Sequence, residues 1–323
     1  MKNLLVLLFT FSVIFNLQAQ NDWENPAIFE RNQTEAHAPL TPFENIEEAL
    51  EGNREANAFY QSLNGTWKFN WVSTVAEASK DFYLDESKVS AWDDIEVPSN
   101  WQMTGYGHPM FRNVTMEFPE KAPMVPEYYN PVGSYFRTFV VPDNWDGRQI
   151  FLHFEGVKSA SYVWVNGKEV GYNQGGFEPA EYDVTSFVRP GKNTIAVKVL
   201  RYSDGSFLEN QDMWRLSGIY RNVYLFAAPK VHMRDYFFFT DFDENYENAA
   251  FNFEVELANY TQKSEKISVQ INLWDGDEKV KLSRASRQSV KVEAGKVQKA
   301  FIGDKVIKPK QWSAEKPNLY TLT

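Results

Sequence analysis

The sequence predicts an all-β protein built from sandwich domains. Residues 66–71, 134–140 and 194–200 alternate between apolar and polar side chains, and this period of two is typical of half-buried strands. Helical periodicity is confined to residues 46–60, where it allows a turn or two. A mature chain of about 300 residues is longer than one hydrophobic core usually serves, so two domains are expected.

The chain starts with a predicted secretion signal over residues 1–19. Lys2 precedes a largely apolar run from Leu4 to Phe15, and Ala19 closes the segment, which is the layout of a secretory signal. The alternative, a membrane anchor, needs roughly 20 apolar residues. The chain has no cysteine, which excludes disulfides and a lipidated cysteine. We therefore expect an exported bacterial protein, periplasmic or secreted, with no membrane partner.

Composition also restricts the ligand. The net charge of −10 argues against nucleic acid, which requires clustered Lys and Arg. The aromatic share of 16% exceeds what core filling usually needs. Flat aromatic faces stack on sugar rings, although large β-sandwich cores also use them. A neutral or cationic ligand is expected, with no organic cofactor.

An extended arm and the first sandwich follow the signal. Residues 20–43 contain three prolines and little periodicity, so we expect an arm that packs over other domains; disorder is the alternative. Residues 44–228 are assigned to a jelly-roll sandwich. Within it, Asn166 and Gly167 separate two alternating runs, which predicts a hairpin with a type I′ turn.

A smaller sandwich is predicted for residues 229–323. The sequence AAPK at residues 227–230 interrupts the strand pattern, and longer strands follow at residues 251–257 and 267–274. Their spacing suits an immunoglobulin-like domain.

Two long loops, residues 97–115 and 200–219, are rich in polar and aromatic side chains, and loops beside strands are where binding groups usually lie. They carry part of a series of motifs that resembles glycoside hydrolase family 2, and within it the large β-galactosidases. Six ordered matches argue strongly against coincidence. The motifs are DWENP (22–26), SLNGTWKF (62–69), PSNWQ (98–102), NVT (113–115), DGS with QDMWR (204–206 and 211–215), and WSAEKPNLY (312–320).

The resemblance implies a galactose-binding-like jelly roll, an immunoglobulin-like domain and then a (β/α)8 barrel that holds the catalytic glutamates. The sequence ends at Thr323, which leaves no room for the ~250 residues of such a barrel. We expect the front part of a retaining β-galactosidase acting on a β-galactoside or oligosaccharide, with no catalytic residue of its own. Either the sequence is a fragment or the gene is truncated. The arm also resembles one that supports a homo-oligomer.

By the same resemblance, Asn113 and Asp204 bind the sugar. Asn113 matches a position whose amide bonds the galactosyl ring; an amide offers both a donor and an acceptor to neighbouring hydroxyls. Its alternative is a glycosylation acceptor. Asp204 matches a position that reaches the galactose and binds sodium beside the primary hydroxyl of the sugar. Its alternative is to cap the turn formed with Gly205.

Asp22 and Asn25 resemble a peripheral cation site whose oxygen ligands suit magnesium. A simple turn capped by Asp22 is an equal alternative.

Three acidic side chains suggest a glycosidase pair, since retaining hydrolysis uses two carboxyls ~5 Å apart. We reject Glu178, Glu209 and Asp212 for that role because the family places it in the barrel. The segment from Asp212 to Arg215 is expected to form a buried ion pair. The histidines are expected to be scattered, with His153 on the polar face of its strand.

Two other functions fit the same residues. A stand-alone lectin-like protein would bind galactose without hydrolysis. A structural adhesin module would do neither.

Overall fold

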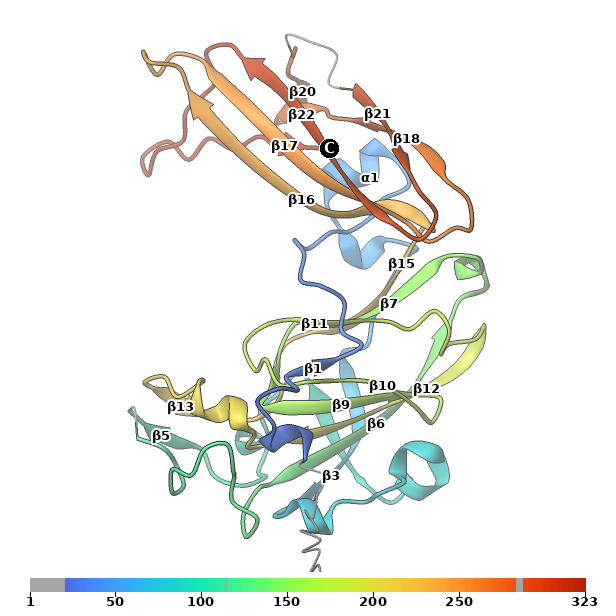
Figure 1. The fold of residues 1–323 in the computed structure, drawn as a ribbon, viewed down its shortest axis with the longest axis vertical. Helices are drawn as coiled ribbons and strands as arrows, with labels where there is room; N and C mark the ends of the chain where they lie inside the picture. The colour runs from blue at the N-terminus through green and yellow to red at the C-terminus, as the bar shows by residue number, and fades with distance from the viewer. Residues whose placement is uncertain (1–20, 114, 283–286) are drawn as a thin grey trace, which may run out of the picture.

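A computed structural model describes residues 21–113, 115–282 and 287–323, whose strands form two lobes joined end to end (Figure 1). The predicted signal at residues 1–19 lies outside them. No described helix is long and apolar enough to cross a membrane. The all-β prediction is confirmed, since the described residues contain one α-helix, α1 (Ile46–Glu51). The 3₁₀ turns are η1 (Asp22–Glu24), η2 (Arg54–Ala56), η3 (Val75–Glu77), η4 (Phe82–Leu84), η5 (Glu86–Val89), η6 (Trp101–Met103), η7 (Asp143–Trp145) and η8 (Asp204–Phe207).

The first lobe is a sandwich of antiparallel sheets with seven and four strands. The larger sheet has the order β1-β10-β9-β12-β6-β3-β4, and the smaller sheet has the order β11-β7-β15-β2. Their strands are β1 (Glu30–Arg31), β2 (Tyr60–Ser62), β3 (Gly65–Val72), β4 (Asp93–Val97), β6 (Val132–Val141), β7 (Gln149–Phe154), β9 (Ala160–Val165), β10 (Lys168–Asn173), β11 (Ala180–Asp183), β12 (Gly191–Leu200) and β15 (Val223–Ala228).

Alternation along β3 explains how the larger sheet meets the core. Trp67 and Phe69 are buried on one face of β3 and pack with Tyr135 in the main core cluster. The predicted hairpin is confirmed between β9 and β10, where Asn166 and Gly167 have φ of 50° and 77°. Positive φ at both positions is what a type I′ turn requires.

Two short ribbons extend the first lobe toward its loops. β5 (Met110–Arg112) pairs with β13 (Met213–Arg215), and β8 (Val157–Lys158) pairs with β14 (Gly218–Ile219). The β5–β13 ribbon projects from the side of the sandwich (Figure 1). It therefore brings together two chain segments that are far apart in the sequence.

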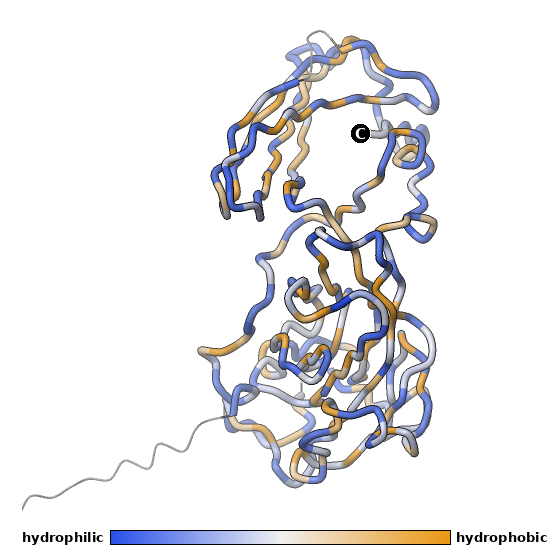
Figure 2. Tube along the Cα trace, turned by 90° about the vertical axis from the view of Figure 1, so that its right-hand side faces the viewer, coloured by the Kyte–Doolittle hydropathy of each residue, from blue (hydrophilic) through white to orange (hydrophobic). Residues whose placement is uncertain are grey.

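The second lobe is the immunoglobulin-like sandwich. Hydrophobic and hydrophilic positions alternate along its strands (Figure 2), and Phe251, Phe253 and Val255 of β17 are buried in its core. The single strand predicted over residues 267–274 is divided in the structure between β18 and β19. It breaks because Asn272 exchanges two backbone hydrogen bonds with Thr323, which moves the following strand into another sheet. The strands are β16 (Val231–Phe242), β17 (Ala249–Asn259), β18 (Glu265–Gln270), β19 (Leu273–Asp275), β20 (Glu278–Lys279), β21 (Arg287–Val292), β22 (Val297–Val306) and β23 (Thr321–Leu322).

The arm runs along the first lobe and reaches the second (Figure 1). Its strand β1 adds to the edge of β10, and Thr34 donates its backbone N–H to the carbonyl of Glu181. Farther along, the backbone N–H of Ala38 donates to the Asp235 carboxylate at 2.8 Å. Arg234 donates to the carbonyl of Glu35 at 2.8 Å. The arm is thus bonded to both sandwiches.

Candidate functional site

Asp204 begins η8, at the point where the chain has left the long strand β12. The turn is closed by local bonds: the Ser206 N–H donates to the Ser203 carbonyl, and the Ser203 N–H donates to the Ser206 hydroxyl at 3.1 Å. The Ser203 hydroxyl also lies 2.7 Å from that of Ser159 beside β8. These contacts fix the backbone of Asp204 without using its carboxylate.

The Asp204 carboxylate is buried but poorly satisfied. The residue is 7% exposed, and neither carboxylate oxygen makes a hydrogen bond of good geometry with the described residues. Burial raises the pKa of this carboxyl, and the charge of Glu24 acts in the same direction; the Gln174 amide and the backbone N–H of Gly205 oppose the shift. A buried carboxylate without a full set of partners is costly unless a cation neutralises it. The site therefore fits the sodium ion that the resemblance implies.

Asn113 follows β5 and is exposed to solvent. Its ribbon is held in register by the pairs Met110–Arg215, Phe111–Trp214 and Arg112–Met213. The rings of Phe111 and Trp214 meet edge to face with centroids 5.6 Å apart. The backbone carbonyl of Asn113 accepts a hydrogen bond of 2.8 Å from Arg215. The exposed side-chain amide of Asn113 is therefore attached to a backbone that Arg215 holds in place.

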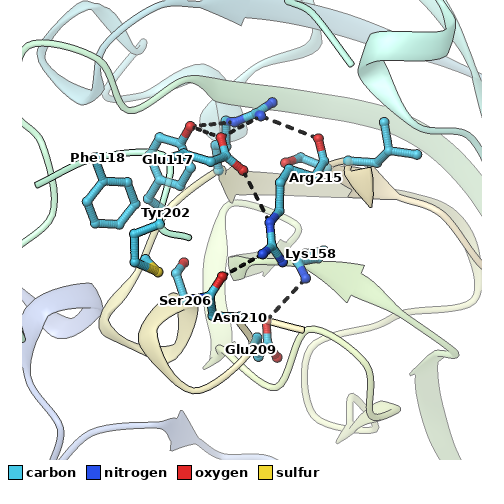
Figure 3. Close-up of a pocket in the computed structure, with 12 residues that line it drawn as sticks. Glu117, Phe118, Lys158, Tyr202, Ser206, Glu209, Asn210 and Arg215 are labelled. Carbon is cyan, nitrogen blue, oxygen red and sulfur yellow. Dashed lines mark hydrogen bonds and ion pairs between the residues drawn. The ribbon is translucent and has the colours of Figure 1, made fainter. Parts of the chain in front are cut away.

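Arg215 belongs to a buried cluster of charged side chains (Figure 3). Arg201 donates to the Glu117 carboxylate at 2.9 Å, and the Tyr202 hydroxyl donates to the same oxygen. The other Glu117 oxygen lies 4.0 Å from Nε of Arg215. Arg215 also donates to the side-chain oxygen of Asn210. The expected ion pair of Arg215 exists, but its partner is Glu117. Asp212, which was grouped with it, is exposed.

Lys158 and Glu209 complete the cluster at its lower end in Figure 3. Nζ of Lys158 lies 3.8 Å from the Glu209 carboxylate and 3.8 Å from the centre of the Phe177 ring. Burial lowers the pKa of Lys158 to about 8, although Glu209 opposes the shift. Glu209 also accepts the backbone N–H of Gly176 at 2.6 Å. This pair therefore connects the Asp204 region to the chain after β10.

The predicted magnesium pair has other partners in the structure. The Asp22 carboxylate forms an ion pair with Arg31 and accepts a hydrogen bond of 2.7 Å from Tyr162. The Asn25 side chain accepts the backbone N–H of Ala27 at 3.2 Å. Asp22 is therefore not the cap of its own turn, and its charge is already paired with Arg31, which disfavours a divalent cation there. The turn itself, η1, packs against η8, so it lies beside Asp204.

His153 lies, as expected, on the face of β7 opposite the core residues Ile150, Leu152 and Phe154, but that face is buried as well. Nδ1 of His153 lies 2.9 Å from one oxygen of Glu181, and Nε2 of His37 lies 2.9 Å from the other. Two histidines thus meet across one carboxylate at the arm. No group of at least three His, Cys, Asp or Glu side chains in the described ranges is arranged to hold a metal ion.

Of the acidic side chains rejected as catalysts, Glu178 and Glu209 line one hollow beside the arm, whereas Asp212 lies outside it. Glu209 is engaged by Lys158 and Gly176, whereas Glu178 and Asp212 are exposed on separate loops. The exposed Asn113 amide and the buried Asp204 carboxylate are the candidate groups for binding a ligand. Sequence reasoning missed Glu117 and Lys158, because neither lies in a motif and both acquire their partners only in the folded chain.

Comparison with known proteins follows the two lobes. Residues 60–229 match the pattern described as "Glycosyl hydrolases family 2, sugar binding domain", and residues 231–323 match "Glycosyl hydrolases family 2". A β-galactosidase of Priestia megaterium is 40% identical over 307 residues, which are 93% of this chain and 30% of that protein. The chain thus spans less than a third of the length of this curated relative.

Solved structures share the fold. A Bacteroides uniformis β-glucuronidase superposes with a TM-score of 0.63 at 22% identity, over 81% of this chain and 29% of that one. A family 2 glycosyl hydrolase from Bacteroides cellulosilyticus gives a TM-score of 0.61 at 23% identity, over 81% of this chain and 33% of that one. At these identities the likeness concerns the fold alone.

Proposed function

Because the chain belongs to glycoside hydrolase family 2 and carries its sugar-binding domain followed by its immunoglobulin-like domain, we propose that it supplies the galactose-recognition part of a retaining β-galactosidase. The observation that carries this proposal is Asp204, a buried carboxylate whose oxygens lack good hydrogen bonds. Unsatisfied buried charge at a loop points to a ligand rather than to stability. The identity to a β-galactosidase supports galactose as the sugar.

Asn113 and Asp204 have distinct roles in this proposal. The Asn113 amide donates to one ring hydroxyl and accepts from another, which selects their arrangement. Asp204 orients the primary hydroxyl of the sugar, directly and through a sodium ion that it holds. A bound sodium ion supplies positive charge that attracts hydroxyl oxygens. Bond cleavage belongs to two carboxyls of a catalytic barrel, ~5 Å apart as retaining hydrolysis requires.

Export to the periplasm or beyond the cell, directed by the residues before Asn21, is part of the same proposal. It places the enzyme where extracellular β-galactosides enter. Measuring which cell fraction holds the protein when it is expressed from its first codon tests this step: retention of residues 1–19 in a cytoplasmic protein would refute it.

The direct test joins this chain to the portion of the P. megaterium relative outside the match. We expect no hydrolysis of nitrophenyl β-D-galactoside by the chain alone. The chimera should hydrolyse it in preference to the β-glucuronide and β-mannoside. Asp204→Asn and Asn113→Ala should each raise KM by about 10-fold or more, the loss expected when a buried polar contact to substrate is removed.

Circular dichroism and a melting curve establish that each chimera is folded. Substantial turnover by the isolated chain, or a preference for the glucuronide, overturns the proposal. If a chimera does not fold, calorimetric titration of the chain with galactose in sodium chloride replaces it. In that case, the proposal is contradicted if neither Asp204→Asn nor Asn113→Ala weakens the binding of galactose.

A further inference from the structure

The structure assigns a positioning role to Arg215. We infer that this side chain sets the place of Asn113 relative to Asp204, and this inference rests on the proposed function. We call residues 113 and 115–131 the Asn113 loop, and residues 201–212 the Asp204 loop. From β13, the guanidinium of Arg215 donates to the Asn113 carbonyl at 2.8 Å and to the side-chain oxygen of Asn210. One side chain thus bonds both loops at once.

Neighbouring charges fix the orientation of this guanidinium. Arg215 is 7% exposed, and its Nε faces the Glu117 carboxylate at 4.0 Å. Glu117 is held in turn by Arg201 and Tyr202, both from the Asp204 loop. Arg201 also donates to the backbone carbonyl of Arg215 at 3.3 Å. A buried cation with this many fixed partners has little freedom to move.

Three arginines restrain the two ends of the short stretch that carries Asn113. At one end Arg215 bonds the Asn113 carbonyl. At the other end Arg112 donates to the Met116 carbonyl at 3.2 Å, and Arg201 holds Glu117. The Asn113 amide is itself exposed. Its position therefore depends on this backbone restraint rather than on packing of its own side chain.

Lysine does not substitute for Arg215 in this geometry. Its ammonium is a single point charge, whereas the planar guanidinium presents several donors in a fixed fork. Arg215→Lys keeps the buried charge near Glu117 but loses the simultaneous bonds to Asn113 and Asn210. A recognition group displaced by about 1 Å can lose about 100-fold in rate. We expect a loss of about 10-fold in kcat/KM, since one of two sugar contacts is affected.

A double-mutant cycle in the chimera tests the inference through kcat/KM for nitrophenyl β-D-galactoside. Arg215→Lys, Asn113→Ala and the double variant are compared with the parent chimera. If Arg215 acts through Asn113, the substitution costs about 10-fold with Asn113 present and less than about 2-fold in the Asn113→Ala background. Equal losses in both backgrounds would overturn the inference, because they indicate general damage.

Arg137→Lys is the matched control. Arg137 also donates to two backbone carbonyls, those of Leu63 and Asn64, but it lies in β6 away from both loops. The Arg137→Lys substitution should lower the melting temperature of the chimera without changing its kcat/KM by more than about 2-fold. If Arg215→Lys chimeras do not fold, Asn210→Ala removes the second loop contact, and the same cycle with Asn113→Ala decides the matter.

The cycle separates failure of this inference from failure of the proposed function. If Asn113→Ala alone leaves kcat/KM unchanged, the proposed sugar role of Asn113 is wrong, and the positioning role falls with it. If Asn113→Ala lowers kcat/KM but Arg215→Lys does not, the sugar role stands and the positioning role alone is overturned.

Discussion

Glu181 and Asp204 are buried to nearly the same degree in the first sandwich, 6% and 7% exposed, yet their surroundings are opposite. Glu181 receives His37, His153 and the Thr34 hydroxyl. Burial alone would raise the pKa of Glu181, but the hydrogen bonds from the two histidines outweigh it and bring the pKa to about 2. Burial raises the pKa of Asp204, because none of the described histidines faces its carboxylate and the opposing contributions of Gln174 and Gly205 are smaller.

The difference separates a structural carboxylate, Glu181, from the carboxylate proposed to bind sugar, Asp204. The Glu181 carboxylate bonds His37 of the arm and His153 of the sandwich, and its removal leaves both histidines without this partner. An unsatisfied buried charge is a cost that folding alone does not explain. The same burial therefore predicts opposite results when each carboxylate is changed, and the experiments below test that contrast.

The largest effect is expected for Glu181→Ala. Removing one partner of a buried, hydrogen-bonded pair typically costs about 3 kcal/mol or more, so urea unfolding of the chain should show a loss of that size. Glu178→Ala, an exposed glutamate on the loop before β11, is the control, with an expected change below about 0.5 kcal/mol. If Glu181→Ala is as stable as Glu178→Ala, Glu181 does not stabilise the fold and the contrast with Asp204 fails.

Asp204→Asn should behave in the opposite way. Neutralising an unsatisfied buried charge should leave the free energy of unfolding unchanged or raise it by up to about 1 kcal/mol. It should also abolish stabilisation by sodium, which for the parent chain reaches about 2.7 kcal/mol at 100 times the dissociation constant. Melting curves in sodium chloride and in choline chloride at equal ionic strength measure both effects.

Asp212→Asn provides the control for Asp204, because Asp212 lies in the same loop but is exposed. It should retain the full response to sodium. A parent chain that melts identically in the two salts would show that Asp204 holds no sodium in this chain.

The contrast also marks where sequence reasoning succeeds. The strands and the hairpin were predictable because alternation and the Asn166–Gly167 turn are local properties of the chain. Asp204 and Asn113 were found only through the resemblance. The link between His37 and Glu181 joins positions 144 residues apart, and no local pattern encodes it. The break at Asn272 was missed for the same reason, since its partner is the distant Thr323.

Stability should depend on pH through the Glu181 cluster. The pKa of Glu181 is lowered from 4.5 to about 2, so its contribution is complete above pH 4.5 and disappears as pH falls toward 2. The hydrogen bond to Glu181 raises the pKa of His37 above 6.5, so the contribution of His37 is complete below pH 6.5 and disappears as pH rises through the raised value. The cluster is therefore most stabilising between about pH 4.5 and 6.5.

Urea unfolding between pH 2 and 9 measures this window. His37→Gln should flatten the decline above pH 6.5 and also shrink the acid limb, because His37 supplies one of the two histidine hydrogen bonds that lower the pKa of Glu181. Asp204 has the opposite sign, because its raised pKa makes its charged form a burden as pH rises above its unfolded value of 3.8. Through Asp204, the parent chain should therefore lose stability as pH rises above 3.8, and Asp204→Asn should remove that loss. An unchanged profile in His37→Gln would contradict the proposed coupling with Glu181.

The smallest effect concerns Asp22, which resembles Glu181 in having its charge satisfied. Arg31 and Tyr162 engage its carboxylate, but its side chain is 21% exposed, so solvent screening reduces the gain. Asp22→Asn should cost about 1 kcal/mol in urea unfolding, toward the lower end for bonds to a charged group. Because Asp22 and Asn25 already have protein partners, added magnesium chloride should not raise the melting temperature of either chain. If magnesium raises the melting temperature of the parent chain and Asp22→Asn abolishes this rise, Asp22 is instead a carboxylate that binds a cation, as proposed for Asp204.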